Sequence, residues 1–396
     1  MTVDVFPARG LGAIAGIGAT DFSKASGRSE LTLATQAAVA AAEDAGVDVK
    51  DIDGIVRCDM DLVHPNDLSH VLGLRDLTYW GDVGPGGVAP SAMVGQAVAA
   101  ILTGQATTVL VFRSLNGRSG QRFGQASSTS GAVGGNGTYD EFFMPFGLTS
   151  PGQVFAMFAR RHMIEFGTRE EDFGAIAINS RERALVNPQA QMHGRPLTME
   201  DYLASRQIAT PLRLFDFCLE TDGACAVIVT STERARDLRQ PPAVVRAWAQ
   251  GTGFGVQPGI GFPALMREDL TSLPSKAVAE TLYRRAGLGP SDIDVAQLYD
   301  CYTVTVLMQL EDYGFCEKGE GGSFVSSGAI DIDGQIPTNT SGGQLSEGYI
   351  HGMTHVLEGV RQIRGTSTSQ VTDAELCLVT STPYSPGSAL ILEAAS

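Results

Sequence analysis

Hydrophobic residues recur at helical spacing over residues 30–45, ELTLATQAAVAAAEDA, and Gly46 follows them. A short linker then leads to Asp-Ile-Asp at 51–53 and to an apolar run that ends at Asp59. This pattern predicts an amphipathic helix, a glycine that caps its C-terminus, and a buried strand that the Asp-Ile-Asp triplet opens.

The same order of features occurs a second time near the end of the chain. The segment SKAVAETLYRRAGLGPSDIDVAQLYD, residues 275–300, again reads as helix, glycine, Asp-Ile-Asp and strand. Gly46 and Gly287 are 241 positions apart, and so are Asp59 and Asp300. A shared offset of this kind indicates an internal duplication of a helix, turn and strand unit.

A further repeated unit extends the duplication. Segments 95–114 and 358–381 both show a helical pattern, a glycine, a loop and an apolar strand. An apolar strand pattern also begins near residue 10 and again near residue 242, after two prolines. We therefore expect an α/β fold with two duplicated halves, residues 1–240 and 241–396, in which mixed β-sheets are layered between helices.

The stretch from about residue 115 to 225 interrupts this alternation. It contains the Gly/Ser-rich run GQASSTSGAVGGNG and then amphipathic segments such as GQVFAMFARRHMIEFGT. We interpret it as a long insertion that covers one end of the first half.

Composition and charge narrow the classes of function. The 396 residues are 43% hydrophobic and 18% charged, which is typical of a well-packed globular protein. The formal net charge of -16 disfavours nucleic acid and anionic membranes as partners. There is no apolar run of 18 residues and no basic leader, so we expect a cytoplasmic protein. The six cysteines form no C-x-x-C pair and predict reduced thiols rather than a zinc site.

The segment SGGQLSEGYIHG, residues 341–352, holds the strongest candidate chemistry. Tyr349 and His351 are two residues apart in a glycine-bracketed loop, and both side chains can carry protons. The alternative is an ordinary turn that precedes a helix. His351 and His355 have H-x-x-x-H spacing without a nearby third ligand, so we expect no metal site, and we expect a structural role for His355.

The duplicated halves and the late N-T-S-G-G…G-Y-x-H-G loop resemble the thiolase-fold superfamily, and within it the thiolase-like lipid-transfer proteins. The resemblance covers essentially the whole chain. It implies a nucleophilic cysteine near Gly87, but no cysteine occurs between Asp59 and Phe217. The late loop STPYSPG at 381–387 lacks the second thiol. Thiolase chemistry through an acyl-cysteine therefore has no nucleophile here.

The remaining catalytic positions of thiolases are also changed. The N-E-A-F motif reads Y-D-C-Y, with Tyr299 at the Asn position and Asp300 at the Glu position. In the G-G-x-x-x-x-G-H-P motif, Tyr349 takes the place of the His. This combination resembles the actinobacterial steroid side-chain aldolases, which cleave a β-hydroxyacyl-CoA into a ketosteroid and propionyl-CoA.

That resemblance implies partners as well as an activity. We expect a homodimer that pairs through the first-half sheet, bound to a zinc-ribbon and OB-fold DUF35 protein that is fused to or bound with a MaoC-like hydratase. Coenzyme A enters as part of the substrate, and no other cofactor is expected. Arg118, Arg122 and Gly343 are the expected CoA-binding residues. Together with Arg113, the first two form a basic cluster that suits phosphates, although a solvated loop would look the same.

Retro-aldol cleavage needs a base for the hydroxyl proton and an acid for the enolate carbon. We assign Tyr299 as the base and Tyr349 as the acid, with His351 or a water passing the proton on; the exchange of the two tyrosine roles stays open. A phenolate base requires a nearby positive charge or hydrogen bonds, because burial alone opposes ionisation. The carboxylate of Asp300 would also oppose it unless that side chain points away.

Two rival functions remain at this stage. One is a thiolase or acyltransferase in which Cys301, two residues from Tyr299, is a displaced nucleophile. The other is a non-catalytic lipid-transfer or scaffold subunit. The segment GTGFGVQPGIG at 251–261 is not a third possibility, because Val256 stands where a dinucleotide fingerprint requires its last glycine.

Overall fold

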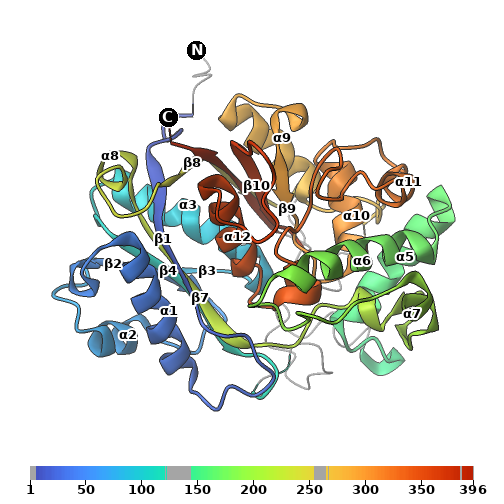
Figure 1. Ribbon diagram of the computed structural model, residues 1–396, viewed down its shortest axis with the longest axis horizontal. Coiled ribbons are helices and arrows are strands. Elements are labelled where there is room, and N and C mark those ends of the chain that lie inside the picture. The colour runs from blue at the N-terminus through green and yellow to red at the C-terminus, as the bar shows by residue number, and fades with distance from the viewer. Residues whose placement is uncertain are drawn as a thin grey trace.

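The computed structural model describes residues 6–120, 122, 144–253, 265, 267–383 and 386–395, and Figure 1 shows their arrangement. Most of the Gly/Ser-rich run of the insertion and most of segment 251–261 lie outside these ranges. Within them, every helix is too short or too polar to cross a membrane.

The first half alternates strands and helices as the repeat predicts. Its elements are β1 (Gly12–Ala19), α1 (Glu30–Ala45), β2 (Gly54–Cys58), α2 (Pro65–Leu72), β3 (Tyr79–Val83), α3 (Ala89–Leu102), β4 (Val109–Asn116), β7 (Asp222–Ser231) and α8 (Thr232–Ala235). The second half contains β8 (Ala243–Gly251), α9 (Ser275–Ala286), β9 (Val295–Gln297), α10 (Thr303–Asp312), α11 (Gly321–Ser326), a π-helix (Gly343–Glu347), α12 (Met353–Arg364), β10 (Leu376–Ser381) and β11 (Gly387–Ala394).

The duplicated unit has the same local structure in both halves. Gly46 and Gly287 cap α1 and α9 in the left-handed conformation, with φ of 75° and 69°. A single 3₁₀ turn follows each cap, at Val49–Asp51 and Pro290–Asp292, and leads into β2 or β9. The predicted glycine caps are therefore confirmed, and each Asp-Ile-Asp triplet runs from the last residue of this turn to the start of the strand.

The strands form one mixed sheet that runs through both halves. Among the described residues its order is β3-β2-β4-β7-β1-β8-β11-β10-β9. The antiparallel pairing of β1 with β8, in which Gly12 lies opposite Val245, joins the two halves. The strands β1, β2, β4 and β7 thus mirror β8, β9, β10 and β11. The predicted division at residue 240 falls in the connection before β8 and stays a prediction.

Two helices form the centre of the molecule. The residues of α3 are almost entirely buried, and those of α12 are buried over most of the helix. Both pack against strands of both halves, whereas α1 and α9 cover outer faces of the sheet (Figure 1). The helices and strands therefore form the layers that the sequence predicts, and the late loop enters the core directly before α12.

The position predicted for the insertion is wrong. Its described elements are α5 (Pro151–Phe166), α6 (Glu170–Val186), α7 (Met199–Ala204) and the short strands β5 (Gln207–Ala209) and β6 (Leu212–Arg213). Helix α6 packs against α10, α11 and the π-helix, and α5 packs against α10. The insertion covers the second half rather than the first, because its apolar residues join the core cluster built around α10.

Candidate active site

The end of β9 places Tyr299 in the interior. The backbone N–H of Tyr299 donates to Thr380 Oγ1 over 2.8 Å. Its carbonyl oxygen accepts hydrogen bonds from Gln309 Nε2 at 2.8 Å and from Thr305 Oγ1 at 2.9 Å. Strand β10 and helix α10 thus fix the backbone of Tyr299 from two sides, and its side chain is buried.

The hydroxyl of Tyr299 lies against Gly87. A Cβ atom at Gly87 would stand 2.0 Å from the Tyr299 hydroxyl oxygen, far inside van der Waals contact. Gly87 precedes α3, at the position where the thiolase resemblance implies the nucleophilic cysteine. The tyrosine therefore occupies the space that any side chain at position 87 would need.

Tyr349 comes from the loop between the π-helix and α12. Its backbone N–H donates to Thr221 Oγ1 over 2.9 Å, and its side chain is half-buried. The side chains of Tyr299 and Tyr349 are hydrogen-bonded to each other. Burial raises the pKa of Tyr299 well above its ordinary value, and the neighbouring Tyr349 and Cys301 add to the effect. The structure thus brings the two tyrosines together, with Tyr299 held in its neutral form.

The carboxylate of Asp300 is held by the π-helix and α12. Its buried carboxylate accepts hydrogen bonds from the backbone N–H groups of Gln344, at 3.0 Å, and Leu345, at 3.3 Å. It also accepts one from His355 Nε2 at 2.7 Å. The carboxylate is therefore directed at the π-helix and α12, and the structural role expected for His355 is to hold it there.

Gly343 has a packing role in the structure, and its predicted contact with CoA stays a prediction. It is buried and adopts a φ of 58°, a region that side chains rarely tolerate. A Cβ at this position would stand 2.1 Å from Asp300 Oδ2. The glycine thus allows the start of the π-helix to approach the carboxylate, and this explains Gly343 without a ligand.

A buried ion pair lies behind the late loop. Arg113 Nη1 donates to Asp61 Oδ1 over 2.7 Å, and both side chains are almost fully buried. The backbone N–H of Ser114 donates to the same carboxylate oxygen over 2.9 Å. Burial alone would lower the pKa of Arg113, but Asp61 and the nearby Cys58 and Tyr349 raise it above its ordinary value. Arg113 is therefore a permanent cation beside Tyr349.

Arg113 also determines the state of His351. Its Nε–H donates to His351 Nδ1 over 3.0 Å. Because a guanidinium can only donate, Nδ1 is an acceptor and the imidazole proton resides on Nε2. Burial and the charge of Arg113 hold the pKa of His351 well below its ordinary value. This environment disfavours the imidazolium form, and the role of His351 in passing a proton on stays a prediction.

The predicted basic cluster separates into two parts. Arg113 is buried in the interior, where it cannot meet the phosphates of CoA. Arg118 and Arg122 both form ion pairs with Glu220, at 3.4 Å and 2.5 Å, and remain partly exposed. These two residues stay a predicted contact for a phosphate, although Glu220 already offsets their charge.

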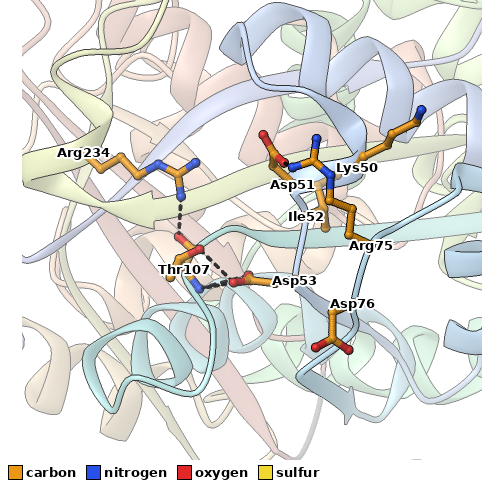
Figure 2. Close-up of a pocket in the computed structure, with 8 residues that line it drawn as sticks. All are labelled: Lys50, Asp51, Ile52, Asp53, Arg75, Asp76, Thr107 and Arg234. Atoms are coloured by element: carbon orange, nitrogen blue, oxygen red, sulfur yellow. Dashed lines mark hydrogen bonds and ion pairs between the residues drawn. The ribbon is translucent and has the colours of Figure 1, made fainter.

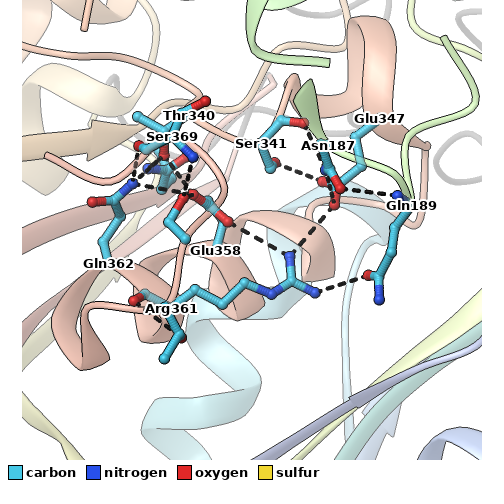
Figure 3. Close-up of polar contacts among 12 residues, drawn as sticks. Asn187, Gln189, Thr340, Ser341, Glu347, Glu358, Arg361, Gln362 and Ser369 are labelled. Carbon is cyan, nitrogen blue, oxygen red and sulfur yellow. Dashed lines mark hydrogen bonds and ion pairs between the residues drawn. The ribbon is translucent and has the colours of Figure 1, made fainter. Parts of the chain in front are cut away.

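A second buried network holds the residues that precede the loop (Figure 3). The guanidinium of Arg361, on α12, lies 3.5 Å from carboxylate oxygens of both Glu347 and Glu358. Glu347 also accepts hydrogen bonds from Ser341 Oγ at 2.6 Å and from Asn187 Nδ2 at 3.2 Å. Asn187 caps α6, so the insertion directly contacts the segment that carries Tyr349.

A separate groove of about 320 Å³ lies where β2 and β4 begin (Figure 2). Its polar groups largely bond one another: Asp53 accepts from Thr107, Arg234 donates to Thr107, and Arg75 pairs with Asp51. A charged and open groove of this kind does not suit a bulky apolar acyl group, so we do not assign it as the substrate site.

The cysteines lack the features of nucleophiles. All six are free, and burial raises the pKa of each thiol, to about 12 for Cys58 and well above the ordinary value for Cys301. A reactive cysteine needs a depressed pKa, so the displaced-nucleophile role considered for Cys301 is not supported. No group of three or more metal-ligating His, Cys, Asp or Glu side chains occurs among the described residues.

The sequence analysis assigned no catalytic role to Asp61 or Arg113. The signal was present for Arg113, because a charged residue within the apolar run TTVLVFRS indicates a buried, paired charge. Its partner could not be found from the sequence, since Asp61 lies 52 positions away and reaches Arg113 only through the pairing of β2 with β4.

Comparison with known proteins places this geometry in a family. Residues 264–392 match the Thiolase C-terminal domain-like family. The chain is 45% identical over 388 residues to the steroid side-chain-cleaving aldolase of Thermomonospora curvata, covering 97% of this chain and 98% of the relative. It is 45% identical over 385 residues to the 17-hydroxy-3-oxo-4-pregnene-20-carboxyl-CoA lyase of Mycobacterium tuberculosis, with 97% and 99% covered.

Solved structures agree with the sequence comparison. The Ltp2-ChsH2(DUF35) aldolase superposes with a TM-score of 0.91 at 45% identity, covering 98% of both chains. Human mitochondrial 3-ketoacyl-CoA thiolase in complex with CoA superposes with a TM-score of 0.70 at 14% identity, covering 98% of this chain and 99% of that one, which shows the shared fold alone. The two full-length relatives and the replaced thiolase residues lead to one conclusion: this chain belongs to the steroid side-chain-cleaving aldolases of the thiolase fold.

Proposed function

We propose that this protein cleaves a carbon–carbon bond in a β-hydroxyacyl-CoA by a retro-aldol reaction. The substrate is a steroid CoA thioester with a tertiary hydroxyl, and the products are a ketosteroid and propionyl-CoA. The observation that carries this proposal is the hydrogen-bonded pair Tyr299 and Tyr349, of which Tyr299 lies against Gly87. The names and full-length similarity of the two relatives support the substrate class.

The reaction moves one proton and consumes no co-reactant. The tertiary hydroxyl loses its proton and becomes the ketone, and the bond to the α-carbon of the thioester breaks. The bonding electron pair passes to the thioester as an enolate. Its α-carbon then takes up one proton, which gives propionyl-CoA.

The tyrosine pair can take up and return that proton. In the resting state Tyr299 is neutral and Tyr349 carries the negative charge. Tyr299 accepts the hydroxyl proton while it passes its own to Tyr349 through their hydrogen bond. Tyr349 then donates a proton to the enolate carbon, which restores the starting state. Tyr299 keeps its predicted role of base and Tyr349 that of acid.

This arrangement supplies the positive charge that a phenolate requires. Arg113 interacts electrostatically with Tyr349, and one of its buried nitrogens, Nη2, has no hydrogen-bond partner among the described residues. A cation next to a phenol favours the phenolate form. We therefore place the negative charge of the pair on Tyr349, the tyrosine on which this cation acts.

The proposal includes partners. A DUF35 protein is part of the similar aldolase complex, and we propose that this chain binds one, fused to or bound with a MaoC-like hydratase. We also propose a homodimer through β3, which is the outermost strand of the sheet on the first-half side. Coenzyme A would reach the site as part of the substrate, and the cytoplasmic location stays a prediction.

The test is product formation by the complex of this chain with a DUF35 partner. We expect 17-hydroxy-3-oxo-4-pregnene-20-carboxyl-CoA to give ketosteroid and propionyl-CoA in equal amounts. Tyr299→Phe and Tyr349→Phe should each lower kcat by about 10²-fold or more, the usual contribution of a proton-transferring group. Substrate that binds tightly without turnover would favour the scaffold role, and a covalent acyl-cysteine detected by mass would favour the thiolase role.

A further inference from the structure

Arg181, on α6, is a buried cation that has only neutral partners. The residue is 6% exposed, and its guanidinium donates from Nε to Ser346 Oγ over 3.0 Å and from Nη1 to the carbonyl oxygen of Arg195 over 3.2 Å. The ring of Phe215 lies 5.5 Å from the guanidinium carbon. Among the described residues, no carboxylate forms an ion pair with Arg181. The charge of this side chain is therefore not offset within the described part of the chain.

Other arginines that are buried as deeply have an anionic partner. Arg113 pairs with Asp61 at 2.7 Å, and Arg364 pairs with Asp44 at 2.7 Å. A buried charge is costly unless an opposite charge offsets it. Carboxylates are abundant in a chain whose formal net charge is -16, yet none of the described ones approaches Arg181. This difference indicates that an anion from outside the chain completes the surroundings of Arg181.

A second arginine lies beside the first and is exposed to solvent. The side chain of Arg195 makes no hydrogen bond or ion pair with the described residues. Burial lowers the pKa of Arg181 below its ordinary value, and the positive charge of Arg195 lowers it further. The Nη2 group of Arg181 also has no hydrogen bond to the described residues. Two guanidiniums that repel each other and keep donors unused are arranged to bind an anion.

The two arginines lie next to the segment that carries Tyr349. Ser346, which accepts the hydrogen bond from Arg181, is in the π-helix, three residues before Tyr349. The segment of Arg195 contacts the same element, because the backbone N–H of Met192 donates to the carbonyl oxygen of Ser346 over 3.2 Å. Three residues span at most about 11 Å. The guanidiniums are therefore within reach of the nucleotide end of an acyl-CoA whose thioester lies at Tyr349.

We propose that Arg181 and Arg195 form the site for the 3′-phosphate of the coenzyme A that the substrate carries. This inference rests on the proposed function. A phosphate monoester has a charge of about -1.5 to -2 at neutral pH and three acceptor oxygens, so it offsets two cations where a carboxylate would offset one. Arg195 donates to the phosphate from the solvent side, and Nη2 of Arg181 donates from the interior. The diphosphate of coenzyme A suits this pair less well, because each of its phosphorus centres carries a smaller charge.

This pair differs from Arg118 and Arg122 in its charge balance. Arg118 and Arg122 both form ion pairs with Glu220, so a phosphate at those residues would have to compete with a carboxylate. At Arg181 and Arg195, a phosphate displaces no carboxylate of the described residues. We therefore expect Arg181 and Arg195 to contribute more to the binding of CoA than Arg118 and Arg122 do.

The test measures the Kd of propionyl-CoA and of propionyl-3′-dephospho-CoA by calorimetry, with the purified complex of this chain and a DUF35 partner. We expect Arg195→Gln to raise the Kd of propionyl-CoA by about 10-fold, the loss typical of one charge-assisted hydrogen bond, and to leave the Kd of the dephospho analogue unchanged. Arg181→Lys keeps the charge without the planar fork and should raise the Kd of propionyl-CoA less. Arg160→Gln is the matched control, since Arg160 is an exposed arginine on α5.

Equal Kd values for the two ligands in the wild type would overturn the proposal. An equal rise for both ligands in Arg195→Gln, or a rise no larger than in Arg160→Gln, would overturn it as well. The measurement needs binding but no turnover. If the wild type prefers the 3′-phosphate through Arg195 yet cleaves no steroid thioester, the proposed function fails while the phosphate site stands. If the wild type cleaves the substrate and its preference does not depend on Arg195, the function stands and the phosphate site fails.

Discussion

At the scale of single residues, Gly87 and Tyr299 depend on each other. The hydroxyl of Tyr299 fills the space that any side chain at position 87 would occupy. A glycine at this position is thus a requirement of the site, although the sequence shows it only as one of several glycines before α3.

We expect Gly87→Ala to displace the Tyr299 hydroxyl and to lower kcat by about 10²-fold, the cost typical of moving a catalytic group by about 1 Å. The purified variant should keep its fold, as judged by circular dichroism. Gly289→Ala is the matched control, because an added Cβ there meets only Asp292 at an ordinary 3.9 Å. Wild-type kcat in Gly87→Ala would contradict the placement of Tyr299.

At the scale of elements, the loop between the π-helix and α12 depends on the insertion. Asn187, at the end of α6, donates to the carbonyl oxygen of Ser341 over 2.9 Å and to Glu347 over 3.2 Å. Ser341 and Glu347 are both buried and precede Tyr349 by eight and two positions. The insertion is therefore part of the support for the catalytic loop.

Replacing Asn187 with Ala should leave part of this network unpaired. We expect a loss of about 1–3 kcal/mol in the free energy of unfolding, measured by urea denaturation, together with a reduced kcat. Gln189→Ala is the control, since it removes an exposed side chain that accepts from Arg361 and keeps the backbone N–H that donates to Asn187 Oδ1. Equal kcat in both variants would show that α6 does not position the loop.

The repeated elements could be predicted from the sequence because hydrophobic spacing and glycine caps are local properties. Helix α1, its cap at Gly46 and the matching α9 with Gly287 were all visible in this way. The sequence could not show which side of the molecule the insertion covers. The packing of α6 on α10 is a long-range contact, and no local pattern in the sequence indicates it. The contact of Asp61 with Arg113 could not be predicted for the same reason.

The candidate site was predicted in part. Tyr299 and Tyr349 were identified through a family resemblance, and the structure brings them together. The state of His351 could not be predicted, because it depends on Arg113, 238 positions away in the sequence. The contact of Gly343 with CoA stays a prediction, and its packing against Asp300 could not be predicted because the two residues are 43 positions apart.

At the scale of the whole molecule, the outer edge of β3 is the surface proposed for a second copy of the chain. Strand β3 pairs with β2 on one side, and Trp80 on this strand is 63% exposed. An exposed edge strand with a large apolar side chain is prone to pair with another chain.

We expect the chain to sediment as a dimer and Trp80→Glu to shift it toward the monomer, because the substitution would bury a charge in the interface. Ile164→Glu is the control, since Ile164 is 70% exposed on α5, away from the sheet edge. Analytical ultracentrifugation of both variants at matched concentrations measures the effect. A dimer of unchanged stability in Trp80→Glu would place the interface elsewhere.

The central claim is that the tyrosine pair moves a proton from the substrate hydroxyl to the α-carbon of the departing thioester. The most direct measurement is turnover of 17-hydroxy-3-oxo-4-pregnene-20-carboxyl-CoA in D₂O by the complex with its DUF35 partner, with mass analysis of both products. The account predicts ketosteroid and propionyl-CoA in equal amounts, one deuterium on the propionyl α-carbon, and neither product above background from Tyr299→Phe. Bound substrate without cleavage, or full activity in Tyr299→Phe and Tyr349→Phe, would contradict it.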